Sequence, residues 1–366
     1  MAGHFRDKRI ERLAALAALM ILFVGTTFAQ HYQRTDLTTD SSSVSSAPNI
    51  DPNLVNAWGL SRSTASPWWI SDNGTGLSTL YDGTGAIQSL VVTIPPPKGV
   101  KGTSAPTGTV YNYTTSFEVT PGAPAIFIFV TEDGTIAGWS PAVDLNNAVI
   151  KVNAPDRAIY KGCAIATTAN GPRLYAANFK TGNLEVYDGN FNRVNSEEHF
   201  RATLPPNYVP FNVQNVGGSL VVAYAQRDPG SKDENQGPGL GFVVVYDLTG
   251  KVLLKVQHGQ FLNAPWGIAL APGDFGTFSH RLLIGNFGDG TIDAFNAFSG
   301  KFEGKLLDST GANLTIDGLW ALSFAGNSAG NGSATELYFT AGPNDESDGL
   351  FGKLTATDSE QRGNSE

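Results

Sequence analysis

Six aligned positions in the sequence carry the side chains most suited to binding a ligand. They fall early in short apolar segments such as "NAWGLS" and "APWGIAL". The aligned residues are Trp58, Thr107, Lys161, Phe211, Trp266 and Trp320. Aromatic rings that meet in one place suit a sugar ring or an apolar ligand, and a lysine suits a carboxylate. The alternative is that the tryptophans pack between structural units as core.

Acidic and amide side chains recur in the turns that follow the next apolar segment of each unit. Asn178, Asn286 and Asp289 are expected to share one site with the aligned aromatic residues. Oxygen ligands of this kind are also what Ca²⁺ prefers. The candidate metal ligands are Asp72, Asp133, Asn344 and Asp345. The alternative is ordinary turn chemistry, because Asn and Asp bond their own backbone and tolerate left-handed φ.

The sequence contains no catalytic motif in the structural setting that the motif requires. Gly326–Gly330, "GNSAG", matches the G-x-S-x-G pattern but lies in a Gly/Ser/Asn loop and not on a strand-to-helix elbow. The histidines are scattered, without the spacing of a zinc site or a triad. Cys163 is expected to be a small buried residue. The segment 226–241, "QRDPGSKDENQGPGLG", is long enough to be a lid, and a plain surface insertion is the alternative.

The elements that must position these residues follow from a repeat. A turn glycine precedes an aromatic residue by five positions in five of six copies, and a leucine replaces the aromatic in the last. The pairs are Gly76/Tyr81, Gly134/Trp139, Gly182/Tyr187, Gly241/Tyr246, Gly290/Phe295 and Gly349/Leu354. A period of roughly 50–60 residues with several strand signals per unit predicts propeller blades. We therefore predict an all-β fold, a six-bladed β-propeller of four-stranded antiparallel blades.

The last unit lacks a fourth strand in its own sequence. Tyr32–Thr39, "YQRTDLTT", is predicted to supply it and to close the ring, which also hides an open edge. The expected organisation is a signal peptide over 1–29, a closing strand and Ser-rich linker over 30–48, the propeller over 49–357, and a polar tail over 358–366. The signal peptide is indicated by Arg6, Lys8 and Arg9, followed by an apolar run and small residues before Gln30.

Composition narrows the range of partners. The chain of 366 residues has a formal net charge of −9, and no Lys/Arg cluster follows the leader. A nucleic-acid partner is therefore not expected, because binding to phosphates needs basic side chains. We expect a secreted or periplasmic monomer, without a membrane span once the leader is cleaved, that meets a small ligand or an extracellular or periplasmic protein.

Several motifs together carry a family resemblance. "NLVNAWGL", "DNGTGLSTLYDGTG", "GPRLYAANFKTG", "APWGIALAP", "LLIGNFGDGTI" and "LYFTAGPNDESDGLFG" resemble uncharacterised, exported bacterial propeller proteins with repeats in the style of the NHL and YVTN families. The resemblance covers nearly all of residues 31–352 and implies six blades, but no activity. Some members carry a Pro-Glu-Pro sorting signal and an apolar tail, whereas this chain ends "TATDSEQRGNSE".

Two functional hypotheses remain open at this point. The first is a non-enzymatic exported scaffold or ligand-binding protein, with its site at the mouth of the central channel. The second is a calcium-dependent hydrolase that resembles the lactonase propellers, in which a bound cation polarises a carbonyl or activates water.

Overall fold

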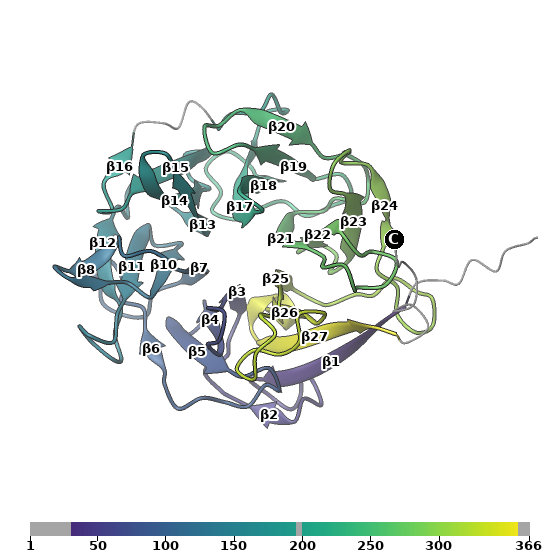
Figure 1. Cartoon of the computed structure of the whole chain (residues 1–366), viewed down its shortest axis with the longest axis horizontal. Helices are drawn as coiled ribbons and strands as arrows, with labels where there is room; N and C mark the ends of the chain where they lie inside the picture. Colours follow the sequence, from purple (N-terminus) through teal and green to yellow (C-terminus); the bar gives the residue numbers. More distant parts are fainter. Residues whose placement is uncertain (1–30, 195–199, 358–366) are drawn as a thin grey trace, which may run out of the picture.

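Six sheets stand around a central axis in the computed structural model, which describes residues 31–194 and 200–357 (Figure 1). Five sheets are four-stranded, and the sixth contains five strands. The strands that line the axis come from all six sheets, and each sheet fans outward from it. The predicted six-bladed propeller is therefore confirmed.

The blades are numbered along the chain, and their strands run from the axis outward. Blade one contains β3 (Ala57–Ser61), β4 (Trp68–Asp72), β5 (Leu77–Tyr81) and β6 (Val92–Thr93). Blade two contains β7 (Pro106–Tyr111), β10 (Phe127–Thr131), β11 (Thr135–Trp139) and β12 (Val149–Asn153). Blade three contains β13 (Tyr160–Thr168), β14 (Gly171–Asn178), β15 (Asn183–Asp188) and β16 (Arg193–Val194).

The second half of the ring follows the same plan. Blade four contains β17 (Tyr208–Val216), β18 (Ser219–Gln226), β19 (Gly241–Tyr246) and β20 (Val252–Lys255). Blade five contains β21 (Pro265–Leu270), β22 (Arg281–Asn286), β23 (Ile292–Asn296) and β24 (Phe302–Lys305). Blade six contains β25 (Leu319–Phe324), β26 (Leu337–Ala341), β27 (Leu350–Ala356), β1 (Tyr32–Thr39) and β2 (Asn49–Ile50).

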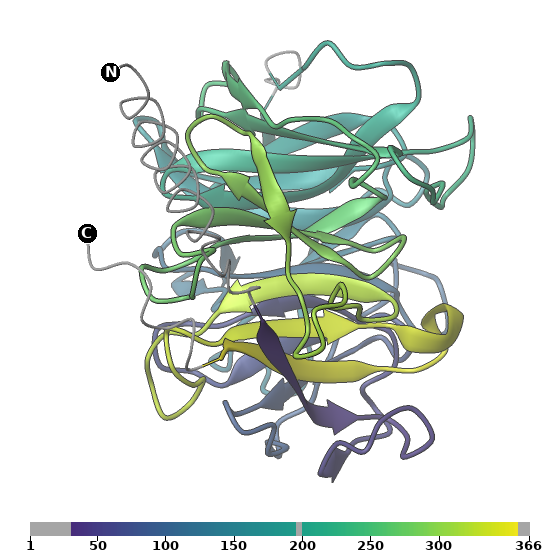
Figure 2. The same ribbon diagram turned by 90° about the vertical axis from the view of Figure 1, so that its right-hand side faces the viewer.

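The N-terminal strand closes the ring as predicted. β1 pairs antiparallel with β27 from Tyr32 opposite Ala356 to Thr39 opposite Leu350, and both strands lie at the outer side of blade six (Figures 1 and 2). β2 then adds to the edge of β1 in parallel, which the sequence did not predict. Blade six therefore contains strands from both ends of the described chain.

The turn glycines of the repeat adopt the expected backbone in most blades. Gly76, Gly134, Gly182 and Gly290 have φ between 69° and 76°, a left-handed conformation that favours glycine. Their turns join the second and third strands at one end of the blades. One further feature was not predicted, namely the small hairpin of β8 (Glu118–Thr120) with β9 (Ala123–Pro124).

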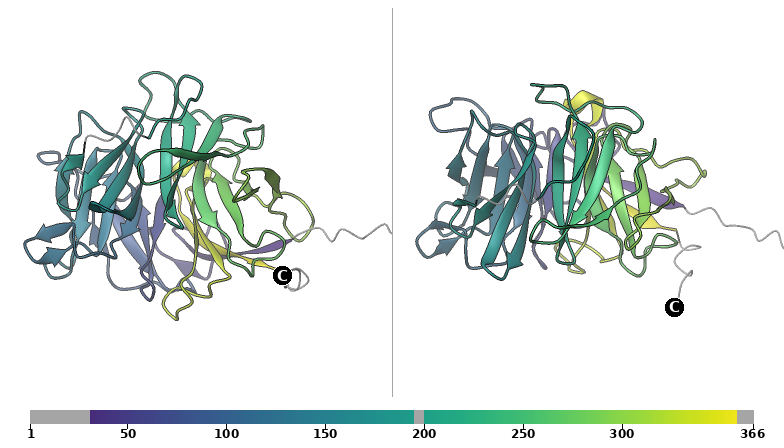
Figure 3. Two further views of the ribbon diagram at one scale, coloured as in Figure 1. Left: turned by 45° about the horizontal axis from the view of Figure 1, so that its top comes forward. Right: turned by 90° about the horizontal axis from the view of Figure 1, so that it is seen from above.

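One short helical element stands at the end of the sheets where these turns lie. This is α2 (Pro343–Glu346), the yellow coil between β26 and β27 in Figure 3. Asn344, Asp345 and Glu346 all have φ between 53° and 64°. Such a run of left-handed residues is strained without glycine, and strain of this kind gathers at functional sites. Among the described residues, no helix has the length and apolar character needed to cross a membrane.

Candidate ligand-binding site at one end of the channel

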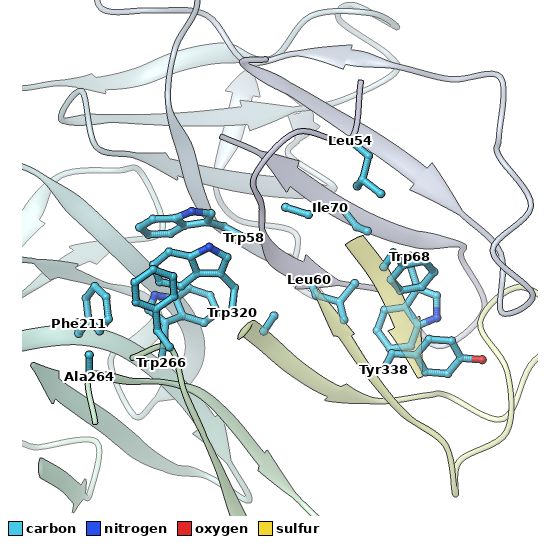
Figure 4. Packing of buried hydrophobic residues seen from close by; sticks show 14 of the residues in the cluster. Leu54, Trp58, Leu60, Trp68, Ile70, Phe211, Ala264, Trp266, Trp320 and Tyr338 are labelled. Carbon is cyan, nitrogen blue, oxygen red and sulfur yellow. The ribbon is translucent and has the colours of Figure 1, made fainter. Parts of the chain in front are cut away.

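We call the end of the channel where the innermost strands begin the front end, and the opposite end the back end. At the front end, Trp58, Trp266, Trp320 and Phe211 converge on the axis (Figure 4). The Trp58 and Trp320 rings stack with centroids 3.7 Å apart, and Trp266 meets both edge-on. The Trp58–Trp266 contact joins blades one and five, which are not neighbours in the ring, so the aromatic side chains meet across the channel below its mouth.

The indoles are not open to solvent. Trp58, Trp266 and Trp320 are exposed by 1%, 2% and 0% of their surface. Their N–H groups are also satisfied inside the protein, as buried indoles require. Trp266 donates to the Lys161 carbonyl at 3.0 Å, while Trp58 and Trp320 both donate to Asn56 Oδ1 at 2.9 and 3.0 Å. The expectation of an open aromatic pocket is therefore not met, because the rings satisfy one another and Asn56.

Asn56 connects this aromatic plug to a polar network above it. Its left-handed backbone, φ 49°, places the side chain over the two indoles. Asn56 Nδ2 donates to Glu346 Oε2 at 2.7 Å and to Asn73 Oδ1 at 3.3 Å. Asn73 Nδ2 in turn donates to Glu132 Oε2 at 3.0 Å. Side chains from blades six, one and two are thus bonded in sequence around the mouth.

Lys161 is the charged centre of the mouth. Its side chain is only 2% exposed, and its Nζ lies 2.6 Å from Glu132 Oε1. The ammonium also stands over three aromatic rings, those of Trp58 at 4.9 Å, Phe179 at 5.5 Å and Phe211 at 5.9 Å. Burial acts to lower the pKa of Lys161, but Glu132 and Glu234 outweigh burial and raise that pKa above its ordinary value. Lys161 therefore carries a charge inside the protein.

Glu132 and Glu234 flank Lys161, but the pKa of Glu132 is lowered and that of Glu234 is raised. Burial acts to raise the pKa of Glu132, and the Lys161 ammonium with Asn73 outweighs it, so the pKa lies below its ordinary value. Glu234 comes from the 226–241 segment of blade four, and its Oε2 lies 3.9 Å from Lys161 Nζ. Burial raises the pKa of Glu234 to about 7, although Lys161 acts against burial. The mouth thus holds one strong ion pair and one carboxyl that is poorly compensated.

A hollow of about 260 Å³ opens beside this cluster, between blades five and six. Its aromatic wall is Phe287, which stacks on Trp320 with centroids 3.9 Å apart. Glu346 and Gln236 also line it, so it adjoins both the polar network and the blade-four loop. Burial raises the pKa of Glu346, even though Asn56 donates to it.

The structure brings only part of the predicted site together. Asn178 and Asn286 are fully buried and serve their own turns, for example through Asn178 Oδ1 with the Lys180 and Thr181 amides. Asn286 Oδ1 accepts from the Asn263 amide and its Nδ2 donates to Asp293. Asp289 lines the hollow but accepts from Thr291. Lys161 stands at the mouth over the aromatic side chains, whereas the two asparagines bond to groups of their own blades.

The candidate calcium ligands do not converge. Asp72 is buried in blade one, Asp133 accepts from the Ala105 amide, and Asn344 and Asp345 belong to α2. In the described parts of the chain, no group of three His, Cys, Asp or Glu side chains is arranged to hold a metal ion. Asp72 and Asp133 instead fit the alternative of structural turn residues.

Two residues of the mouth escaped the sequence reasoning. Asn56 stands two positions before Trp58, and an asparagine just before an aromatic strand start is a signal for a left-handed bend that could have been noticed. Glu234 has no such signal, because its position depends on how the blade-four loop folds back. Glu132 and Glu346 were visible only as members of acidic turns.

Comparisons with known proteins add a family but no activity. No protein-family model matches the chain. The uncharacterised proteins L690 and R648 of Acanthamoeba polyphaga mimivirus are 31% and 30% identical, over 84% and 86% of this chain and 82% and 78% of theirs. These relatives are viral, so the bacterial origin that the sequence resemblance implied is not shown.

Solved structures agree on the fold alone. An arabinofuranosidase of Fusarium graminearum matches with a TM-score of 0.54 and 8% identity, over 90% of this chain and 99% of that one. A protein of unknown function from Bacteroides thetaiotaomicron matches with a TM-score of 0.53 and 10% identity, over 90% and 76%. The sequence similarity is the stronger finding, and this chain belongs to the family of propeller proteins that includes mimivirus L690 and R648.

Proposed function

We propose that this protein is a non-enzymatic, ligand-binding propeller that holds a small molecule at the front end of its channel. The observation that carries the proposal is the buried Lys161 ammonium at the mouth, shared between carboxylates of two other blades. Buried ion pairs add little to stability compared with apolar packing. Buried groups with displaced pKa values in a hollow are characteristic of functional sites. The hollow beside Phe287 adjoins this network through Glu346, and its other charged lining residues are Asp289, Asp317 and Asp345.

A ligand screen with a matched variant tests this function. Thermal shift of the parent protein against sugars, sugar acids and small organic acids should reveal at least one compound that raises the Tm. Lys161→Met should lose that response. Lys305→Met is the control, because Lys305 also pairs with a buried carboxylate, Asp293 at 3.3 Å, but lies in blade five away from the mouth. A response that persists in Lys161→Met would contradict the proposed site.

The calcium-dependent hydrolase remains the competing proposal, and no observation in the structure favours it. It would need oxygen ligands drawn together at the mouth, where Lys161 already neutralises Glu132. Elemental analysis of the purified protein, with thermal shift in Ca²⁺ and in a chelator, separates the two proposals. Bound calcium with a Tm that falls in chelator would favour the hydrolase.

Export is also part of the proposal. The basic and apolar leader over 1–29 lies outside the described residues, and its cleavage is inferred from its sequence pattern alone. The mature chain should begin at or near Gln30 and be found in the periplasm or the medium. Mass spectrometry of the protein from a secreting host checks this, and recovery of the intact chain in membranes would contradict it.

A further inference from the structure

The segment that joins β18 to β19 in blade four covers part of the mouth. Its ends are anchored to other parts of the molecule. Arg227 donates to the Lys180 carbonyl at 2.8 Å, and the Gly237 amide donates to Asn263 Oδ1 at 2.7 Å. Between these anchors the hydrogen bonds that the structure shows are made within the segment or to Gln226, as with Ser231 and Asn235. The middle of the loop is therefore tied to the mouth through Glu234.

Glu234 differs from its neighbours in the loop. Lys232 and Asp233 are exposed, whereas the Glu234 side chain is only 5% exposed and points to Lys161. An exposed loop that places one carboxylate inside the protein loses the hydration of that carboxylate. The ion pair with Lys161 offsets little of this loss, because Glu234 Oε2 lies 3.9 Å from Lys161 Nζ, too far for a hydrogen bond. Glu346 and Asp233 face Glu234 with like charge, and Lys161 is its positive neighbour.

Lys161 has spare capacity to bind. An ammonium offers three N–H donors. Glu132 takes one of them at 2.6 Å, and Glu234 lies too far away to take a second. A carboxylate that came closer than Glu234 would form the hydrogen bond that Glu234 does not form.

We propose that Glu234 stands in for the ligand: the blade-four loop is a lid that closes the empty mouth, and the ligand displaces Glu234 with a carboxylate of its own on Lys161. The inference rests on the proposed binding function and adds the chemical class of the ligand, a monoanionic carboxylate. It also assigns Glu234 as the residue that sets specificity, because Glu234 competes for the same ammonium. Binding and lid opening are then one event.

Chemical rescue tests the class of ligand directly, with acetate as the probe. Glu234→Ala removes the competing carboxylate and leaves Lys161 with Glu132 alone. Acetate at millimolar concentration should raise the Tm of Glu234→Ala, and acetamide at the same concentration should not. Asp233→Ala is the matched control, since Asp233 is the exposed neighbour in the same loop. Equal acetate responses in the two variants, or none in Glu234→Ala, would overturn the inference.

Limited proteolysis tests the lid. Lys232 is an exposed trypsin site in the loop, and cleavage there reports how often the loop opens. Glu234→Gln keeps the size of the side chain and removes its charge, so cleavage at Lys232 should become roughly fivefold faster. Asp233→Asn should cleave at the parental rate. An unchanged rate in Glu234→Gln would show that Glu234 does not hold the loop.

The two proposals fail in different ways. If acetate does not rescue Glu234→Ala while another compound still binds the parent through Lys161, the proposed function stands and the inference about Glu234 is wrong. If acetate rescues Glu234→Ala through Lys161, so that Glu234→Ala/Lys161→Met shows no response, the inference holds whatever the natural ligand is.

Discussion

The two ends of the central channel are built on the same six inner strands, yet they differ in charge. The front end gathers Lys161, Glu132, Glu234 and Glu346 above the aromatic plug. The back end opens into a hollow of about 270 Å³ that is lined by apolar and amide side chains with Ser323, among them Leu60, Ile268, Leu322 and Gln214. No charged side chain from the described residues lines it.

The difference between the two ends shows whether the propeller fold needs buried charged side chains around its channel. At the back end, inner strands meet and close around uncharged side chains. At the front end, the same strands carry a buried ammonium and carboxylates that lose hydration on folding. The charges at the front end are therefore not a requirement of the propeller, and we interpret them as serving a ligand. The predictions below separate the part of the molecule that both ends share from the part that only the front end has.

Removal of the closing strand should have the largest effect, because both ends depend on an intact ring. Deletion of Tyr32–Thr39 takes away the strand that pairs with β27 and exposes its edge. We expect the truncated protein to unfold without cooperativity in thermal denaturation and to aggregate in size-exclusion chromatography. A truncated protein as stable and monomeric as the parent would mean that closure is dispensable.

The aromatic plug separates the two ends, and its loss should be the next largest effect. Trp320 stacks between Trp58 and Phe287, with ring centroids 3.7 and 3.9 Å away. Trp320→Ala should lower the free energy of unfolding by about 3–5 kcal/mol, as for other large buried aromatics. Chemical denaturation measures this. A loss below about 1 kcal/mol would indicate that the plug is loosely packed and that ligands reach it.

Within the front end, removing one partner of the Lys161–Glu132 ion pair should lower the free energy of unfolding more than removing both partners. Glu132→Gln leaves the Lys161 ammonium without its hydrogen-bonded partner inside the protein. The expected loss is about 3 kcal/mol in the free energy of unfolding, because an uncompensated buried charge remains. Asp133→Asn, at the next position in the same turn, is the control. It should change the free energy of unfolding by no more than about 0.5 kcal/mol, as a typical surface substitution does.

A buried carboxyl inside blade one sharpens the comparison further. Asp72 is fully buried, and its Oδ1 has no hydrogen-bond partner among the described residues. Burial raises the pKa of Asp72 well above its ordinary value of 3.8. Blades three and five carry Asn178 and Asn286 at the equivalent end of the second strand, and both amides are bonded. The second strands of the other blades end at Thr131, Gln226 and Ala341, so Asp72 is the one carboxyl at this position in the six blades.

Asp72→Asn should stabilise the protein near neutral pH. When folding raises the pKa of a carboxyl, the carboxyl's contribution to the free energy of unfolding is fully present below its unfolded pKa. That contribution is lost as the pH rises from about 4 towards the folded pKa. The variant should gain roughly 1–3 kcal/mol at pH 7 and nothing below pH ~4. Urea denaturation across this range measures the difference. A variant less stable than the parent at pH 7 would show that Asp72 is ionised and has a partner.

The repeat made most of the fold predictable. The glycine-to-aromatic spacing located the third strand of every blade, and the polar sequence after Leu354 indicated that Tyr32–Thr39 must complete the last one. The β8–β9 hairpin and β2 were missed, because elements of two or three residues are set by neighbours more than by their own pattern.

The site was less predictable than the fold. Alignment of the inner strands placed the tryptophans, Phe211 and Lys161 together, since those positions repeat. It could not show that the indoles face one another and leave no open face, because that depends on how side chains from non-neighbouring blades meet across the axis. Glu234 lies in a loop without periodicity, so only the folded chain reveals its approach to Lys161.

The central claim is that the front-end charges serve binding and not folding, and a double variant tests it most directly. Lys161→Met/Glu132→Gln removes both members of the buried pair, and Glu234, which loses its positive neighbour, stays neutral by keeping its proton, because burial already raises its pKa to about 7. Its free energy of unfolding should lie within about 1 kcal/mol of the parent and well above that of Glu132→Gln, while the ligand-induced rise in Tm disappears. A double variant that unfolds like Glu132→Gln, or that keeps the ligand response, would contradict the account.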